Sequence, residues 1–283
     1  MSSRPLQAAR DGLFWAFCWI SLAFLVIPAV AITVGMVAAS LPVLGIGLLL
    51  NHTNRLGLQN ALLGSGVLGL GVLLVSGPIG VGAGIFLSEY APRRPGAALR
   101  FFSEVLAGIP SIVIGYVGYT VLVVGLHWGY SVLAGILALS VITVPYIARS
   151  TEISLRQVPR TLREGAAALG LSRPVTLWQV VVPPALPGII TGLLLALAIA
   201  TSETAPLLYT VGFSDANPTL GLTQNPIGYL TYVVFVDAQL PDPSAHQLAN
   251  AAAAASLVVV LLLVLLGRWI ASRGQRLSAR MSV

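Results

Sequence analysis

Long apolar segments separated by short polar connections decide which folds are open to this chain. Only 8% of its 283 residues are charged, whereas charged residues make up about a quarter of a soluble protein. A helix of about 17–25 apolar residues crosses a bilayer, and these segments reach that length. We therefore predict an all-α polytopic membrane protein with six transmembrane helices. The predicted spans are 13–39, 61–88, 105–126, 132–148, 188–211 and 249–270.

The arginines predict how these spans are oriented. All 15 basic residues are arginine, and every one except Arg55 lies in the N-terminal tail, at the C-terminal end from Arg268 onward, or in the loop after the second or the fourth span. Because cytoplasmic loops retain positive charge, we expect both termini and the loop 149–187 in the cytoplasm and the acidic segment 211–248 outside. No nucleic-acid partner is expected, since the arginines sit in short loops, as topology signals do, and membrane lipid is the expected surrounding. The predicted organisation is a cytoplasmic tail 1–12, a membrane domain 13–270 and a cytoplasmic tail 271–283.

Two connections between spans carry separate expectations. Residues 89–104 contain three arginines and are predicted to form a polar loop. Residues 40–50 are a further apolar run that Pro42 interrupts. This run is too short to cross the bilayer, so it either lies in the outer interface or extends a tilted first span, and the sequence leaves both open.

The loop 149–187 contains ordered signals for starting and ending helices. Pro159 suits the first turn of a short helix, and Gly170 suits its end because glycine readily adopts a positive φ. Gly165, Ala167 and Ala168 between them have little or no side chain, so another protein can approach this helix closely. A second short helix is predicted after Ser172, which is a suitable N-cap. That helix is expected to end at three prolines, Pro183, Pro184 and Pro187.

The spacing within this loop is specific. It reads Glu164-Gly165-Ala166, three residues, Gly170, nine residues, and then three valines and Pro183. The stretch resembles the EAA loop of ABC importer permeases, with Gly165 for the first alanine and valines for an isoleucine and a leucine. The resemblance implies that Glu164, Gly165, Ala166, Gly170 and Pro183 fit a cleft on a cytoplasmic ATPase subunit and pass its motion to the spans. The alternative is a basic amphipathic loop lying on the bilayer surface.

Residues suited to catalysis are few. The chain has no lysine, which a phosphate-binding P-loop requires, so we expect a transport subunit that does not itself hydrolyse ATP. His52, His127 and His246 lie in predicted outer loops without metal-binding spacing, so no metal or cofactor is expected. Ser65 lies between two glycines in the second span. No histidine at membrane depth could act as its base, which favours helix packing over an intramembrane serine enzyme.

The fifth span contains Glu203, the one ionisable group predicted to lie deep in the membrane. A carboxylate there costs about 2.5–3.5 kcal/mol on insertion scales, so it should face the protein interior, a wet cavity or a partner subunit. Thr201, Ser202 and Thr204 add hydroxyls, and Pro206 frees the backbone carbonyl of Ser202. We predict a translocation pathway or gate. The alternative is a structural hydrogen-bond cluster between subunits.

Two segments carry a further resemblance. Residues 106–113, which include Pro110 and Ser111, and residues 202–208 are similar to the corresponding segments of the A-type permease of the phosphate (Pst) ABC importer. The resemblance implies a type I, MetI-like permease fold in a bacterial plasma membrane, with both segments beside the pathway. That family commonly has an arginine where this chain has Ile199. Positive charge for an anion would therefore come from a partner permease or from helix N-termini.

The resemblance also implies an assembly. Its expected members are a homologous permease subunit, two cytoplasmic ATP-binding subunits and an extracytoplasmic phosphate-binding protein. The expected function is import of inorganic phosphate by alternating access. A permease for another oxyanion or small solute stays open, because the EAA loop does not encode the substrate. An intramembrane enzyme is disfavoured by the absence of a histidine or a second carboxylate near Glu203.

Overall fold

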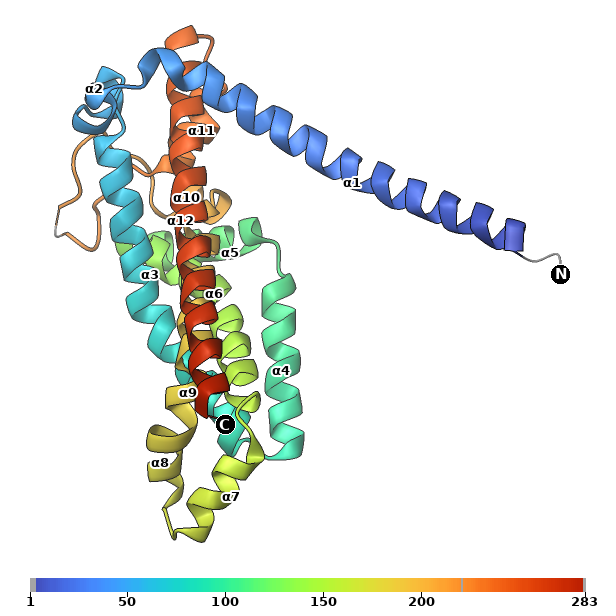
Figure 1. The fold of residues 1–283 in the computed structure, drawn as a ribbon. Coiled ribbons are helices and arrows are strands. Elements are labelled where there is room, and N and C mark those ends of the chain that lie inside the picture. Colours follow the sequence, from blue (N-terminus) through green and yellow to red (C-terminus); the bar gives the residue numbers. More distant parts are fainter. Residues whose placement is uncertain (1–3, 220, 282–283) are drawn as a thin grey trace.

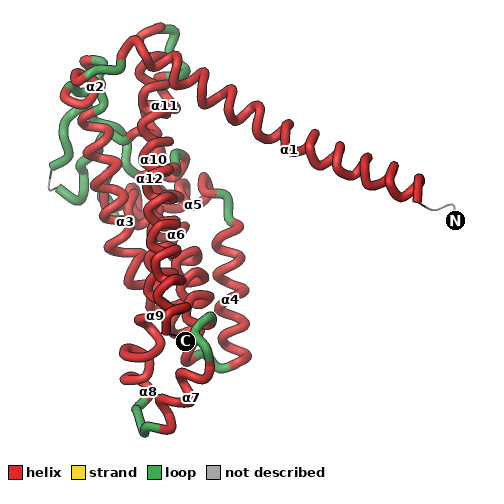
Figure 2. The backbone as a smooth tube through the Cα atoms, in the orientation of Figure 1, coloured by secondary structure: helices red, strands yellow, loops and turns green. Residues whose placement is uncertain are grey.

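The computed structural model describes the backbone of residues 4–219 and 221–281, and the side chains of residues 10–219 and 221–273. Residues 1–3 and 282–283 of the two predicted tails lie outside this part. The described chain is helical and contains no strand (Figures 1 and 2). Its α-helices are α1 (Arg4–Ser40), α2 (Ile46–Leu50), α3 (Gln59–Ile85), α4 (Arg93–Gly108), α5 (Ser111–Gly118), α6 (Val132–Arg156), α7 (Arg160–Ala168), α8 (Arg173–Val175), α9 (Val182–Ser202), α10 (Ala205–Thr210), α11 (Leu230–Asp237) and α12 (Pro243–Met281). Short 3-10 turns are η1 (Leu41–Val43) and η2 (Thr53–Arg55), and π-helical turns are η3 (Phe86–Tyr90), η4 (Tyr119–Gly125) and η5 (Thr176–Val181).

The helices α3, α6, α9 and α12 form the central bundle, and α6 is its most buried member (Figure 1). Glycines on α3 let α6 approach closely. A Cβ at Gly80 would lie 2.6 Å from the Cβ of Ile147, and one at Gly84 would lie 2.5 Å from the Cβ of Thr151. Both distances are too short for two carbon atoms, so a larger residue would push the helices apart. Small residues at helix contacts are typical of membrane bundles.

The first helix, α1, leaves the bundle at an angle instead of packing along it (Figure 1). It contacts α12 and η1, yet no residue of its most apolar stretch is buried within the chain. Lipid or another subunit must therefore cover this helix.

Five single helical segments are long and apolar enough to cross a membrane, and the predicted third span is the exception. It is a pair, α4 and α5 with η4, bent by 91°. Ile109 is extended there, with φ −69° and ψ 129°, because the ring of Pro110 disfavours a helical conformation of the residue before it. A continuous span 105–126 is thus wrong, although counting the bent pair as one span gives the six predicted. The loop predicted for 89–104 is also wrong, since α4 begins at Arg93.

The helices on both sides of the loop 149–187 extend further into it than predicted. The helix α6 continues to Arg156, and helical backbone runs without a gap from Arg173 through η5 to Ser202. The three prolines therefore do not end a helix, because Pro183 and Pro184 lie in the first turn of α9, where a missing N–H costs little. Ser172 occupies the N-cap position of α8, but its side chain makes no capping hydrogen bond.

Connecting segments close the end of the molecule opposite α7 (Figure 1). Ser40 is the last residue of α1, and η1 follows it directly within one apolar segment, Arg10–Val43. After the break at residues 44–45, α2 lies at this end, where Leu48 packs in a buried cluster with Leu58. The segment before α11 turns inward, so that Tyr229 is buried. The backbone N–H of Leu230 donates to Ser65 Oγ at 2.9 Å, which gives that serine a structural partner.

Candidate coupling site and gate

The short helix α7 begins and ends where the sequence predicts. Pro159 occupies its N-cap position, and Gly170 follows its last turn with φ +72°. The backbone N–H of Gly170 donates to the carbonyl of Ala167 at 3.0 Å, and that of Leu171 donates to the carbonyl of Ala166 at 3.1 Å. These two bonds form a Schellman motif, in which glycine adopts the left-handed conformation. The predicted helix is therefore confirmed, including its final glycine.

One surface of α7 is exposed, is not covered by the rest of the chain and is partly apolar. Glu164 and Gly165 are exposed, and a Cβ at Gly165 or Gly170 would meet no atom within 4 Å. Leu169 is 81% exposed, and Trp178 on η5 is 62% exposed. Exposed apolar side chains bordered by polar ones are typical of surfaces that bind another protein.

Two of the predicted coupling residues do not share this bare surface. Ala166 is buried where α7 packs on η5. Pro183 is exposed but belongs to the first turn of α9, after η5. Ala166 therefore holds α7 on the bundle, while Glu164, Gly165 and Gly170 are open to a partner.

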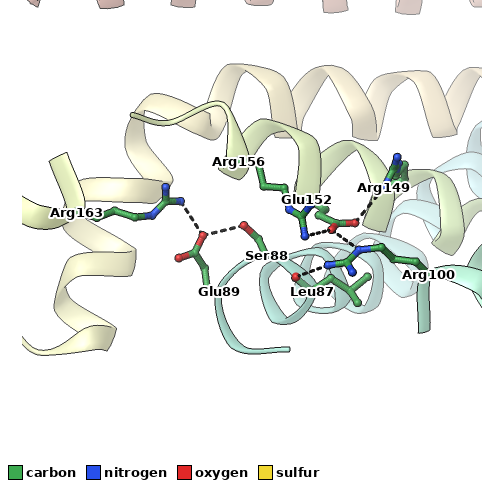
Figure 3. Close-up of polar contacts among 8 residues, drawn as sticks. All are labelled: Leu87, Ser88, Glu89, Arg100, Arg149, Glu152, Arg156 and Arg163. Atoms are coloured by element: carbon green, nitrogen blue, oxygen red, sulfur yellow. Dashed lines mark hydrogen bonds and ion pairs between the residues drawn. The ribbon is translucent and has the colours of Figure 1, made fainter. Parts of the chain in front are cut away.

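One arginine, Arg163, fastens α7 to the bundle (Figure 3). Its guanidinium donates to the carbonyls of Leu155 and Val158, both at 3.0 Å, around the end of α6. Its Nη2 also lies 2.8 Å from Oε1 of Glu89 on η3. Ser88 Oγ donates to the same carboxylate oxygen at 2.8 Å. Arg163 therefore joins α7 both to α6 and to the turn that ends α3.

Glu152 on α6 is the only buried charged side chain among the described residues, with 1% exposure. Its Oε1 lies 2.6 Å from Nε of Arg100 on α4 and 2.8 Å from Nη2 of Arg156. Its Oε2 lies 3.5 Å from Nη1 of Arg149 (Figure 3). Arg100 also donates to the carbonyl of Leu87 on η3 at 3.0 Å, and a cavity of about 150 Å³ lies beside the cluster. A buried carboxylate needs such partners, because leaving it unpaired is strongly destabilising.

Glu152 is not among the predicted site residues, because the arginines around it are interpreted only as markers of the cytoplasmic side of the membrane. Arg149 lies three residues before it and Arg156 four after it, a spacing that brings all three to one face of a helix. That spacing could have revealed the local part of the cluster. Arg100, 52 residues away in the sequence, has no comparable signal.

Glu203 lies at a break in the predicted fifth span. The helix α9 ends at Ser202, Glu203 is extended with φ −76° and ψ 131°, and Pro206 lies in the first turn of α10. A continuous span 188–211 is therefore wrong. The carboxylate of Glu203 is half-buried and makes no hydrogen bond or ion pair within the described residues. Its backbone carbonyl accepts a hydrogen bond from Thr231 Oγ1 at 3.0 Å.

The hydroxyls before Glu203 are used within their own helix. Thr201 Oγ1 donates to the carbonyl of Leu197 at 3.0 Å, and Ser202 Oγ donates to that of Ala198 at 2.9 Å. Such bonds satisfy the hydroxyls without a ligand. Thr204, at the N-cap position of α10, makes no capping bond. Across the residues that the structure describes, no three His, Cys, Asp or Glu side chains are grouped to hold a metal ion.

The two helices that begin at proline breaks lie against each other. Pro110 occupies the N-cap position of α5, and Ser111 is its half-buried first residue. One turn later, a Cβ at Gly115 would lie 2.7 Å from Cα of Pro206 on α10. The predicted gate segments are thus on neighbouring helices. The helix α4, which contains Arg100, directly precedes α5 in the chain.

Comparison with known proteins identifies the class of this protein. Residues 80–276 match the family described as "Binding-protein-dependent transport system inner membrane component". The chain belongs to this family: it is a multi-pass membrane permease of the ABC transporter class and not an enzyme.

Individual relatives extend this result. "Phosphate transport system permease protein PstA 2" of Mycobacterium bovis is 47% identical over 268 residues, which cover 93% of this chain and 89% of that protein. "Phosphate transport system permease protein PstA" of Haemophilus influenzae is 37% identical over 85% of this chain and 81% of that protein. Among solved structures, the inward-facing MetNI methionine ABC transporter matches with a TM-score of 0.55 at 19% identity, over 77% of this chain and 94% of that chain. The predicted MetI-like fold is confirmed.

Proposed function

We propose that this chain is the permease subunit of an ATP-driven phosphate importer and forms half of its translocation pathway. The observation that carries the proposal is the 47% identity to PstA 2 of Mycobacterium bovis over 93% of the chain. The chain has no lysine for a P-loop, so ATP hydrolysis belongs to other subunits.

The ATPase contact is assigned to α7. Its exposed Glu164, Gly165 and Gly170 form an open surface, and the neighbouring Leu169 supplies apolar area for burial against a partner. A homologous permease subunit would cover α1, whose apolar stretch is unburied within this chain. Two ATP-binding subunits and an extracytoplasmic phosphate-binding protein complete the proposed assembly.

The proposed topology places α7 and both tails, residues 1–12 and 271–283, in the cytoplasm. The arginine distribution supports it. Reporter fusions should find Arg160 and the C-terminus inside and Asp237 outside. Cytoplasmic labelling at Asp237 would contradict the proposed topology.

The proposed gate consists of Glu203 with Ser202, Thr204 and Pro206, facing the segment of Pro110 and Ser111. A carboxylate repels phosphate, so Glu203 is not a phosphate ligand. It closes the path by pairing with a donor on the partner permease and opens when the two bundles move apart. The unpartnered, half-buried carboxylate within this chain supports that role.

One experiment tests the function. The complete complex is purified through a tag on this chain, its ATPase and binding-protein partners are identified, and uptake of radiolabelled phosphate is measured in proteoliposomes loaded with ATP. We expect ATP-dependent phosphate uptake that unlabelled sulfate does not compete away. A binding protein that carries another solute, or uptake without ATP, would overturn the proposal.

A further inference from the structure

Charged side chains join four elements in series at the α7 end of the molecule (Figure 3). Arg163 connects α7 to the carboxylate of Glu89 on η3 at 2.8 Å. Two residues earlier on η3, the carbonyl of Leu87 accepts a hydrogen bond from Arg100 of α4 at 3.0 Å. Arg100 in turn pairs with Glu152 of α6 at 2.6 Å. The turn η3 is thus held by α7 on one side and by α4 on the other.

The contact between α7 and η3 has fixed geometry. Arg163 bonds three acceptors at once, namely the carbonyls of Leu155 and Val158 and the carboxylate of Glu89. The Arg163 and Glu89 side chains are only 25% and 20% exposed, so water screens this pair less than it would a surface pair. If α7 tilts, it must either break these bonds or carry η3 with it.

The turn η3 is suited to transmit such a displacement. It is a π-helical turn at the end of α3, closed by a bond from the backbone N–H of Ala91 to the carbonyl of Phe86 at 2.7 Å. Single π turns interrupt the regular helix and are frequent at functional sites. Because Glu89 and Leu87 belong to the same short turn, a shift of one moves the other.

The last step leads from α4 to the gate. Arg100 lies in the middle of α4, which ends at the 91° bend before α5. The helix α5 packs against α10, with Gly115 directly against Pro206. Pro206 follows the break at Glu203, so a displaced α4 changes the position of the gate helices.

We propose that the Arg163–Glu89 ion pair and the bond from Arg100 to the carbonyl of Leu87 are two joints of one relay, which passes motion of α7 through η3 and α4 to the gate helices α5 and α10. The Arg100–Glu152 pair holds the Arg100 side chain in place beside η3. Arg163 and Glu89 act as positioning residues and contact no substrate. The inference rests on the proposed docking of an ATPase subunit at α7. It adds that the motion leaves α7 through a defined charged contact, so breaking that contact separates ATP hydrolysis from transport.

The test uses the complete reconstituted importer with Glu89→Gln, Arg163→Gln and the double variant. Phosphate imported per ATP hydrolysed is measured, together with the amount of ATPase subunit that co-purifies. We expect each single variant to lower phosphate per ATP by at least about fivefold while the ATPase subunits stay bound. Because one joint is already broken in Arg163→Gln, the double variant should be no worse than that single variant.

The matched control is Arg94→Gln, which removes an exposed arginine of α4 and should leave phosphate per ATP unchanged. An unchanged ratio in Glu89→Gln, or two effects that multiply in the double variant, would overturn the relay. Loss of the ATPase subunits from the Glu89 or Arg163 variants would also overturn it, because the pair would then serve docking. A wild-type complex without ATPase subunits would remove the proposed function itself, before any variant is compared.

Discussion

The coupling end and the gate of this permease are stabilised by different kinds of contact. At the coupling end, Arg163–Glu89 and Arg100–Glu152 join helices that are distant in the sequence. At the gate, Glu203 lies at an interrupted helix, and the hydroxyls before it bond to their own backbone. Ion pairs with several bonds fix the distance between helices, whereas a backbone break leaves the flanking segments free to tilt. In the proposed relay, the coupling end would therefore move as a rigid unit, and the helices would change their angle at the proposed gate.

The largest expected effect tests the coupling end. At Gly170 the backbone has φ +72°, and a β-branched residue in the left-handed conformation is strained by about 1–2 kcal/mol or more. We expect Gly170→Val to insert normally, to abolish phosphate uptake and to release the ATPase subunits, because the end of α7 changes shape. Uptake in proteoliposomes and co-purification of the subunits measure both effects.

The control for this variant is Arg173→Ala. Arg173 is an exposed residue at the start of α8, so its loss should reduce uptake far less. A Gly170→Val variant that transports at normal protein levels would contradict the coupling role of α7.

The next effect tests the gate. We expect Glu203→Gln to insert and assemble normally but to lose regulated uptake by about tenfold or to leak without ATP, because a charged hydrogen bond to the partner permease is worth about 1.5–3 kcal/mol. Uptake with and without ATP distinguishes these two failures. If Glu203 only packs the subunits together, the Gln variant should transport almost as wild type while Glu203→Leu weakens assembly.

A smaller effect is expected on stability at the coupling end. Arg100→Gln removes the 2.6 Å contact to the buried Glu152 and the bond to the carbonyl of Leu87. Since Arg149 and Arg156 still face that carboxylate, we expect a loss of about 1–3 kcal/mol and not the larger cost of an unpaired buried charge. The melting temperature of the purified complex should fall, whereas Arg94→Gln should leave it unchanged. Equal melting temperatures would show that Glu152 is held without α4.

The two regions also differ in how far the sequence predicts them. The helix α7 follows from Pro159 and Gly170, because caps and stops are local signals. The break at Ile109 could have been expected from Pro110, but apolar length outweighed it and a continuous span was predicted. The pairing of Arg100 with Glu152 depends on how α4 packs on α6, which no local pattern encodes. The family resemblance named Glu164, Gly165 and Gly170, which are exposed, but also Ala166, which is buried. The structure was needed to find the ion pairs that connect α7 to the bundle.

The smallest expected effect concerns two aspartates at the turn between α11 and α12, which should respond to pH with opposite signs. Burial, with a contribution from the charge of Asp215, raises the pKa of Asp237 in the folded chain. Its charged form is therefore disfavoured by folding, so Asp237→Asn should raise the melting temperature slightly at neutral pH. That gain should vanish as the pH falls through the raised pKa, because the wild-type side chain is then neutral too.

Asp242 provides the contrast: it caps the start of α12, and hydrogen bonds from the side chain and backbone of Ser244 lower its pKa. Asp242→Asn should lower the melting temperature at neutral pH, with the loss fading as the pH falls through the lowered pKa of the wild-type aspartate. Melting curves of the purified complex across this pH range measure both, and shifts of the same sign would contradict the opposite effects expected for the two aspartates.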